Sequence, residues 1–179
     1  KLNNFLTLKN TPVLNKYNFV YNNNKLTLIF KNEEIISVEL GNPDISLLIT
    51  NKLIELESSL SGSFYVLKNK EFPFFDTTHN NNILNSISLI NLNSIYDFEK
   101  KINQKIEPER FRGNFYIKKL KKWEERKWIG ATIKINNIFF KVEKNIPRCS
   151  ATNLQPKTDN KTIDLPNLLK KTYRHMDMG

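Results

Sequence analysis

Apolar and polar residues alternate along the first part of the chain in a pattern typical of β-strands. Segments 16–21 and 25–30 flank a run of three asparagines at 22–24, which predicts a hairpin with a tight turn. Segment 35–39 continues the alternation, and 4–8 is a further short strand candidate. Strands at such close spacing predict an antiparallel meander.

A helix is predicted to follow this meander. Asn42 suits the N-cap and Pro43 the first helical position, while Gly62 is a natural stop. The apolar residues between these signals recur at helical spacing, and they are Ile45, Ile49, Leu53, Leu56 and Leu60. Segment 64–68 then predicts a return to strand.

The middle of the chain changes character. Segment 69–85 has little periodicity and predicts a loop, and 86–90 predicts a strand. The loop contains an aromatic cluster that either anchors it on the core or walls a ligand pocket, formed by Phe72, Phe74 and Phe75.

The last part mixes helices with short strands. Ser94 and Asp97 predict the start of one helix through a capping box, and Asp164 with Pro166 predicts the start of another. Further strands are predicted at 113–117, 131–135 and 138–143. The whole pattern predicts an α+β fold, β-rich and barrel-like, with two or three peripheral helices.

Composition supports one ordinary globular domain. The chain has 179 residues, of which 39% are hydrophobic and 26% charged. No segment approaches the ~20 apolar residues of a membrane span, and the start of the chain lacks a signal-peptide pattern. A single cysteine excludes an internal disulfide and suits a reducing compartment, so we expect a cytoplasmic protein.

The formal net charge of +10 raises the possibility of a nucleic-acid partner. However, the lysines are scattered, and a chain rich in Asn, Lys and Ile is typical of AT-rich coding, so we favour a solvated surface and expect no nucleic acid. The five arginines are more informative, because Arg110, Arg112 and Arg148 fall in two short segments. Arginine presents a planar fork of donors that matches phosphate, so these segments are candidates for anion recognition.

The only cysteine, Cys149, allows two interpretations. A lone cysteine is commonly a small buried hydrophobe. Here Arg148 precedes it, and a cation beside a thiol stabilises the thiolate, which is the form that ligates metals. With one cysteine and two distant histidines, His79 and His175, no zinc-site spacing exists, so a metal would have to bring most of its own ligands.

The segment 110–114, RFRGN, is the second candidate. If it is extended, Arg110 and Arg112 point one way and Phe111 points to the core. Gly113 permits a close backbone approach, and Asn114 adds a neutral donor and acceptor. The pair of arginines either binds a phosphate or belongs to a solvated strand edge. Glycine-rich nucleotide loops are absent from the sequence.

Four segments together resemble a known family. They are SISLINLNSI at 86–95, RFRGNFYI at 110–117, WIGATIKI at 128–135 and PRCSATNLQPKT at 147–158. Their order and spacing resemble the MOSC domain, named after the C-terminal part of molybdenum cofactor sulfurases. We therefore expect residues 1–179 to be a single MOSC domain clipped at both ends, with a strand-rich part at 1–70 and a motif-bearing core at 86–179.

The resemblance implies a molybdenum–pterin cofactor, with Cys149 as the catalytic thiolate and molybdenum ligand. It also implies that the pterin and its phosphate are held or lined by Arg110, Arg112, Asn114, Arg148, Thr152 and Asn153. The implied function is reduction of N-hydroxylated or related small molecules, with electrons from a partner protein. Alternatives are a sulfur-carrier or cofactor-handling module that uses a Cys149 persulfide, and a non-catalytic basic nucleic-acid-binding domain.

Overall fold

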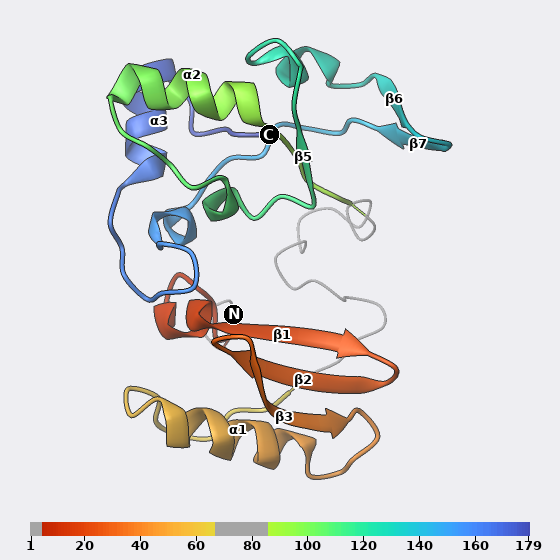
Figure 1. Cartoon of the computed structure of the whole chain (residues 1–179), viewed down its shortest axis with the longest axis vertical. Coiled ribbons are helices and arrows are strands. Elements are labelled where there is room, and N and C mark those ends of the chain that lie inside the picture. The colour runs from red at the N-terminus through yellow and green to blue at the C-terminus, as the bar shows by residue number, and fades with distance from the viewer. Residues whose placement is uncertain (1–4, 67–85) are drawn as a thin grey trace. The chain divides into compact units, whose positions relative to one another are not determined.

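A computed structural model describes residues 5–66 and 86–179 of the chain, coloured along the sequence in Figure 1. The contacts divide the chain into two units. One unit is Val13–Ser86, and the other combines Lys1–Pro12 with Ile87–Gly179. Each unit has its own hydrophobic cluster. The prediction that residues 1–179 form one domain stays a prediction.

The smaller unit is built on a three-stranded antiparallel sheet. Strands β1 (Tyr17–Asn22), β2 (Lys25–Phe30) and β3 (Glu33–Glu39) pair in the order β1-β2-β3. Asn23 and Asn24 turn the first hairpin with φ of 47° and 59°. Asparagine tolerates this left-handed conformation, which a two-residue hairpin turn requires at both positions. The predicted hairpin and meander are therefore confirmed.

Helix α1 (Ile45–Leu56) follows the sheet and contacts β3. It begins later than predicted, because Asp44 occupies the N-cap and the Asn42 side chain accepts a hydrogen bond of 2.8 Å from the Asp44 backbone N–H. It also ends before Gly62, and Leu60 is buried outside the helix. The buried cluster of this unit consists of Val13, Tyr17, Leu28, Val38, Ile49, Leu53 and Leu60.

Two short strand predictions are wrong where the structure describes them. Residues 5–8 and 64–66 have no strand partner. An alternating pattern over so few residues does not form a strand without a neighbouring chain to accept its backbone hydrogen bonds. The predicted loop at 69–85, with its cluster of phenylalanines, lies outside the described residues.

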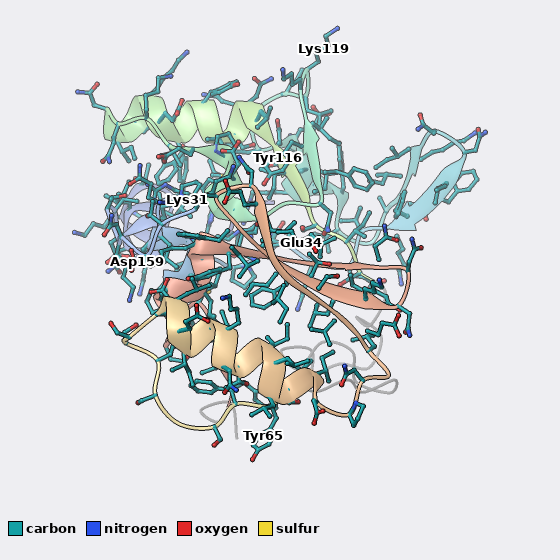
Figure 2. The ribbon with its side chains drawn as sticks, turned by 60° about the horizontal axis from the view of Figure 1, so that its bottom comes forward. Lys31, Glu34, Tyr65, Tyr116, Lys119 and Asp159 are labelled. Atoms are coloured by element: carbon teal, nitrogen blue, oxygen red, sulfur yellow. The ribbon has the colours of Figure 1, made fainter. Side chains whose placement is uncertain are left out.

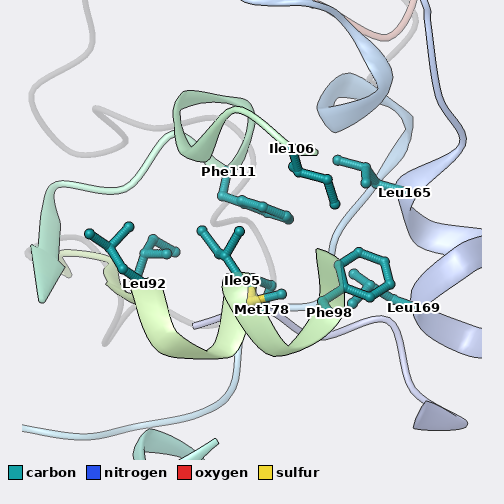
Figure 3. Packing of buried hydrophobic residues seen from close by; sticks show 9 residues of the cluster. Leu92, Ile95, Phe98, Ile106, Phe111, Leu165, Leu169 and Met178 are labelled. Carbon is teal, nitrogen blue, oxygen red and sulfur yellow. The ribbon is translucent and has the colours of Figure 1, made fainter. Parts of the chain in front are cut away.

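The larger unit has helices packed beside two small sheets. Its elements are β4 (Leu89–Asn91), α2 (Leu92–Ile102), β5 (Phe115–Ile117), β6 (Thr132–Ile135), β7 (Ile138–Lys141) and α3 (Leu165–Tyr173). Strands β4 and β5 pair in parallel, whereas β6 and β7 form an antiparallel hairpin. The core seen in Figure 3 is formed by Ile90, Leu92, Ile95, Phe98, Ile106, Phe111, Leu165, Leu169 and Met178.

The start of α2 differs from the prediction. Asn91 is the N-cap, and its side chain accepts a 3.0 Å hydrogen bond from the Asn93 backbone N–H. Ser94 lies inside the helix, fully buried, and donates its hydroxyl to Glu125 at 2.7 Å. The Asn91 amide donates to the other oxygen of Glu125, also at 2.7 Å. The hydrogen bond to Glu125 thus takes Ser94 away from the predicted capping role, and Asn91 caps the helix instead.

Asp97, the expected capping-box residue, instead joins three segments. Its carboxylate accepts hydrogen bonds from Lys122 Nζ at 2.5 Å, Trp123 Nε1 at 2.8 Å and the Tyr173 hydroxyl at 2.9 Å. Burial would raise the pKa of Asp97, but these hydrogen bonds outweigh it and lower the pKa to about 2. The ionised carboxylate therefore ties α2 to α3 and to the segment before β6.

The mixed α+β class is confirmed, but the barrel-like arrangement is not. The described strands form one three-stranded and two two-stranded sheets. A barrel needs every strand to be paired on both sides, and these sheets leave strands unpaired at their edges. Across residues 5–66 and 86–179, no helix is both long and apolar enough to cross a membrane.

Candidate functional site

Cys149 lies on the surface at the start of the short 3-10 helix η7 (Ser150–Asn153). Its backbone carbonyl accepts hydrogen bonds from the Thr152 backbone N–H at 3.0 Å and from the Thr152 hydroxyl at 2.8 Å. Thr152 is itself buried. The thiol is therefore an exposed group on a turn that a buried hydroxyl holds in place, and the interpretation as a core cysteine does not apply.

Arg110 is buried and binds protein groups. Its guanidinium donates to Glu107 at 2.6 Å, to the Asn153 backbone carbonyl at 2.9 Å and to the Thr162 hydroxyl at 2.7 Å. The Arg110 hydrogen bond lowers the pKa of the Glu107 carboxyl. The arginine thereby connects the RFRGN segment to the turn that carries Cys149.

Asn153 and Asn114 also fix the backbone. The Asn153 side-chain oxygen accepts a 3.0 Å hydrogen bond from the backbone N–H of Leu165, the first residue of α3. The Asn114 side-chain oxygen accepts from the backbone N–H of Ser88 at 2.8 Å and from its hydroxyl at 2.9 Å. The Asn153 contact pairs a helix N–H that has no partner within the helix. The Asn114 contacts hold the start of β4 beside β5.

Arg148, next to Cys149, joins two distant segments. It donates to the backbone carbonyl of Met178 through Nε at 2.7 Å and also through Nη2, and to that of Phe111 through Nη1 at 2.9 Å. The guanidinium carbon lies 5.6 Å from the centre of the Phe111 ring. Burial lowers the pKa of Arg148 to about 10, and the nearby Cys149 acts in the opposite direction.

Arg112 differs from the other two motif arginines. It is exposed, and among the described residues its side chain has no hydrogen bond or ion pair. The expected extended segment is wrong, because the 3-10 helix η5 (Pro108–Phe111) ends in Arg112 with φ 50° and ψ 44°. Phe111 is fully buried, as predicted.

Gly113 makes the close approach that the sequence suggests. A Cβ atom there would lie 2.5 Å from Ile90 Cγ1 and 3.2 Å from Tyr116 Cζ. The Gly113 backbone N–H donates to the Tyr116 hydroxyl at 2.9 Å. A side chain at 113 therefore has no room, so the turn after Arg112 depends on glycine.

The structure brings together the RFRGN segment, 110–114, and the segment 147–153 that carries Cys149. The Arg148–Phe111 hydrogen bond joins the residue before Cys149 to the residue before Arg112. Cys149 and Arg112 are both exposed, and the Arg112 guanidinium has no hydrogen bond or ion pair among the described residues. Sequence reasoning missed most of the contacts that brace them, since the partners of Arg148, and those of Arg110 other than Glu107, lie 30 or more residues away.

A metal at Cys149 would need ligands from elsewhere. Within the described ranges, no three His, Cys, Asp or Glu side chains gather as a metal site. The donor set does suit a metal that arrives inside an anionic organic cofactor. The thiol is a soft ligand, and Arg112 with its five N–H donors suits a phosphate group.

The fold and site thus define an α+β protein in which two arginine motifs brace a surface cysteine. A protein-family model of the MOSC domain matches residues 76–179, which is more than half of the chain. The chain belongs to the MOSC domain family, which is associated with molybdenum cofactor binding and includes molybdenum-associated enzymes. No curated protein and no solved structure matches the chain.

Proposed function

We propose that this chain is a cytoplasmic molybdoenzyme that reduces N-hydroxylated or related small molecules, with Cys149 as the molybdenum ligand. The observation that carries the proposal is the exposed Cys149 thiol on a turn braced by the RFRGN segment through Arg110 and Arg148. A rigid first ligand places a bound group with little reorganisation. The MOSC family membership supports the choice of cofactor.

The chain contributes binding and orientation, and the bound cofactor supplies the redox chemistry. The Cys149 thiolate ligates the metal, and Arg112 donates its forked N–H groups to the cofactor phosphate. Arg110, Asn114, Arg148, Thr152 and Asn153 stay predicted pocket residues. The contacts above favour support of the surrounding backbone as their main role, with Asn114 at β4 and the other four at or beside the Cys149 turn.

Reduction of an N-hydroxyl group to an amine consumes two electrons and two protons and releases one water molecule. A partner electron-transfer protein delivers the electrons in this proposal, and solvent supplies the protons. The small-molecule substrate binds beside Cys149, where the thiol is open to the surface.

A second function, sulfur transfer, is favoured by the same exposure of Cys149. In this case the Cys149 thiolate attacks the terminal sulfur of a persulfide on a donor protein. The donor leaves as a thiolate, and Cys149 becomes the persulfide. Such a reaction between two proteins requires an exposed thiol.

Metal and pterin content of the purified protein tests the proposal. Protein made in a host that synthesises the cofactor should contain molybdenum near one atom per chain, and Cys149→Ser should lose it. Ser150→Ala is the matched control on the same turn and should retain the metal. Unchanged molybdenum in Cys149→Ser would refute the ligand assignment.

The phosphate contact and the reaction are tested separately. Arg112→Gln should lower pterin content, whereas Arg174→Gln should not, because Arg174 is a second exposed arginine that ends a helix in the left-handed conformation. Metal-loaded protein should reduce hydroxylamine or amidoxime substrates with an artificial electron donor. Retained metal without reduction would favour the sulfur-transfer function.

A further inference from the structure

The backbone around Arg112 has the form of an anion-binding turn. Arg112 is left-handed and directly follows the right-handed turn of η5. In other proteins, such a succession of conformations can turn backbone N–H groups toward a bound anion. The Arg112 N–H donates to the Glu109 carbonyl at 3.0 Å within the turn, so the Gly113 N–H is the next donor of the series.

In this structure the Gly113 N–H donates to the oxygen of Tyr116 at 2.9 Å, in an exposed setting. Tyr116, labelled in Figure 2, belongs to β5, whose backbone is paired with β4. The residue is 39% exposed. In the part of the chain that the structure describes, the Gly113 N–H is the only hydrogen-bond partner of the Tyr116 hydroxyl. The side chain can therefore turn away at the cost of one neutral hydrogen bond.

We propose that the Tyr116 hydroxyl occupies the position of a ligand oxyanion on the Gly113 N–H, and that a phosphate group held by Arg112 displaces it. The inference rests on the proposed function, since it concerns the phosphate end of the same ligand. The Tyr116 hydroxyl then competes with phosphate for the Gly113 N–H and lowers the affinity of this site for phosphate. It also keeps the Gly113 N–H paired when no ligand is bound.

The direction of one substitution tests this idea. Tyr116→Phe removes the competing oxygen and keeps the ring that packs beside Gly113. Inorganic phosphate should then bind about fivefold more tightly, which corresponds to one net neutral hydrogen bond. If the hydroxyl were a donor to the ligand, the same substitution would weaken binding, so tighter binding separates the two roles.

The Gly113 amide itself can be observed. The chain has five glycines, and Gly113 alone follows an arginine. Labelling with ¹³C-carbonyl arginine and ¹⁵N-glycine therefore gives a single coupled amide signal. Phosphate should shift this signal in the wild-type protein, and the wild-type and Tyr116→Phe signals should converge at saturation.

Matched variants control for indirect effects. Tyr96→Phe alters another exposed tyrosine, on α2, and should leave phosphate affinity unchanged, whereas Arg112→Gln should abolish the Gly113 response. Equal or weaker phosphate binding by Tyr116→Phe overturns the inference, as does a Gly113 signal that phosphate does not move. Absence of molybdenum and pterin with tighter binding by Tyr116→Phe would refute the proposed function and leave the role of Tyr116 standing.

Discussion

Arg148→Gln tests whether the guanidinium beside Cys149 supports the fold or is reserved for a ligand. In the structure it reaches two backbone carbonyls, those of Met178 and Phe111. The Met178 carbonyl belongs to the segment after α3, and the Phe111 carbonyl to the RFRGN segment. Glutamine is shorter and has one amide group, so it can reach at most one of them.

The magnitude follows from these contacts. A hydrogen bond from a charged group contributes about 1.5–3 kcal/mol, and a buried acceptor left unpaired costs about 1–3 kcal/mol. Burial of the charge offsets part of this, as the lowered pKa of Arg148 indicates. We therefore expect Arg148→Gln to lower the free energy of unfolding by about 3 kcal/mol.

Urea unfolding followed by tryptophan fluorescence measures this loss in the relevant unit. Both tryptophans, Trp123 and Trp128, lie in the unit that contains Arg148. Arg112→Gln and Arg174→Gln are the controls, since both arginines are exposed. These two substitutions should change the free energy of unfolding by no more than about 0.5 kcal/mol.

The reasoning would be refuted if Arg148→Gln were as stable as the wild-type chain and still lost the cofactor. That result would mean that the contacts to Met178 and Phe111 contribute little and that the guanidinium acts mainly on the ligand. A large loss of stability in Arg112→Gln would contradict the conclusion that Arg148 stabilises the fold whereas Arg112 does not.

Three further predictions concern stability. Phe111→Ala should cost about 3–5 kcal/mol in urea unfolding, because the ring is fully buried. The lowered pKa of Asp97 means that its ionised carboxylate stabilises the fold fully above pH 3.8, the ordinary pKa of the group. This stabilisation is lost as the pH falls through about 2. Asp97→Asn should therefore make the melting temperature less dependent on pH between these two values. Arg112→Asn should raise the free energy of unfolding by up to about 1 kcal/mol, because asparagine suits the left-handed backbone, yet the variant should retain less pterin.

Signals in neighbouring residues correctly predicted the elements that depend on neighbouring residues, such as a tight turn and a helix start. The asparagine turn at 22–24 matches the observed hairpin, because two residues with positive φ suffice to define it. Asp164 with Pro166 likewise predicted the start of α3 (Leu165–Tyr173). Phe111 is buried as predicted, although the prediction assumed an extended segment and the structure has a 3-10 helix there.

The form of the RFRGN segment was mispredicted, although a signal was present. Pro108 suits the first position of a helical turn, and Glu107 and Arg110 have the spacing of a helical ion pair. These preferences favour the observed 3-10 helix over an extended chain. The contacts of Arg110 with Thr162 and of Arg148 with Met178 had no such signal, since nothing local specifies which distant carbonyl or hydroxyl a buried guanidinium meets.

In the proposed function, Arg112 is the arginine of the RFRGN segment that meets the ligand. Left-handed backbone positions suit asparagine, and this chain places both asparagine and other residues at them, among them Asn103, Lys119 and Arg174. Arg112 adopts the same conformation, and its side chain has no hydrogen bond or ion pair with the described residues. What arginine adds there is a forked, always charged donor next to the segment that Arg148 ties to Cys149. In the proposed function, a bound anion is the partner of that side chain.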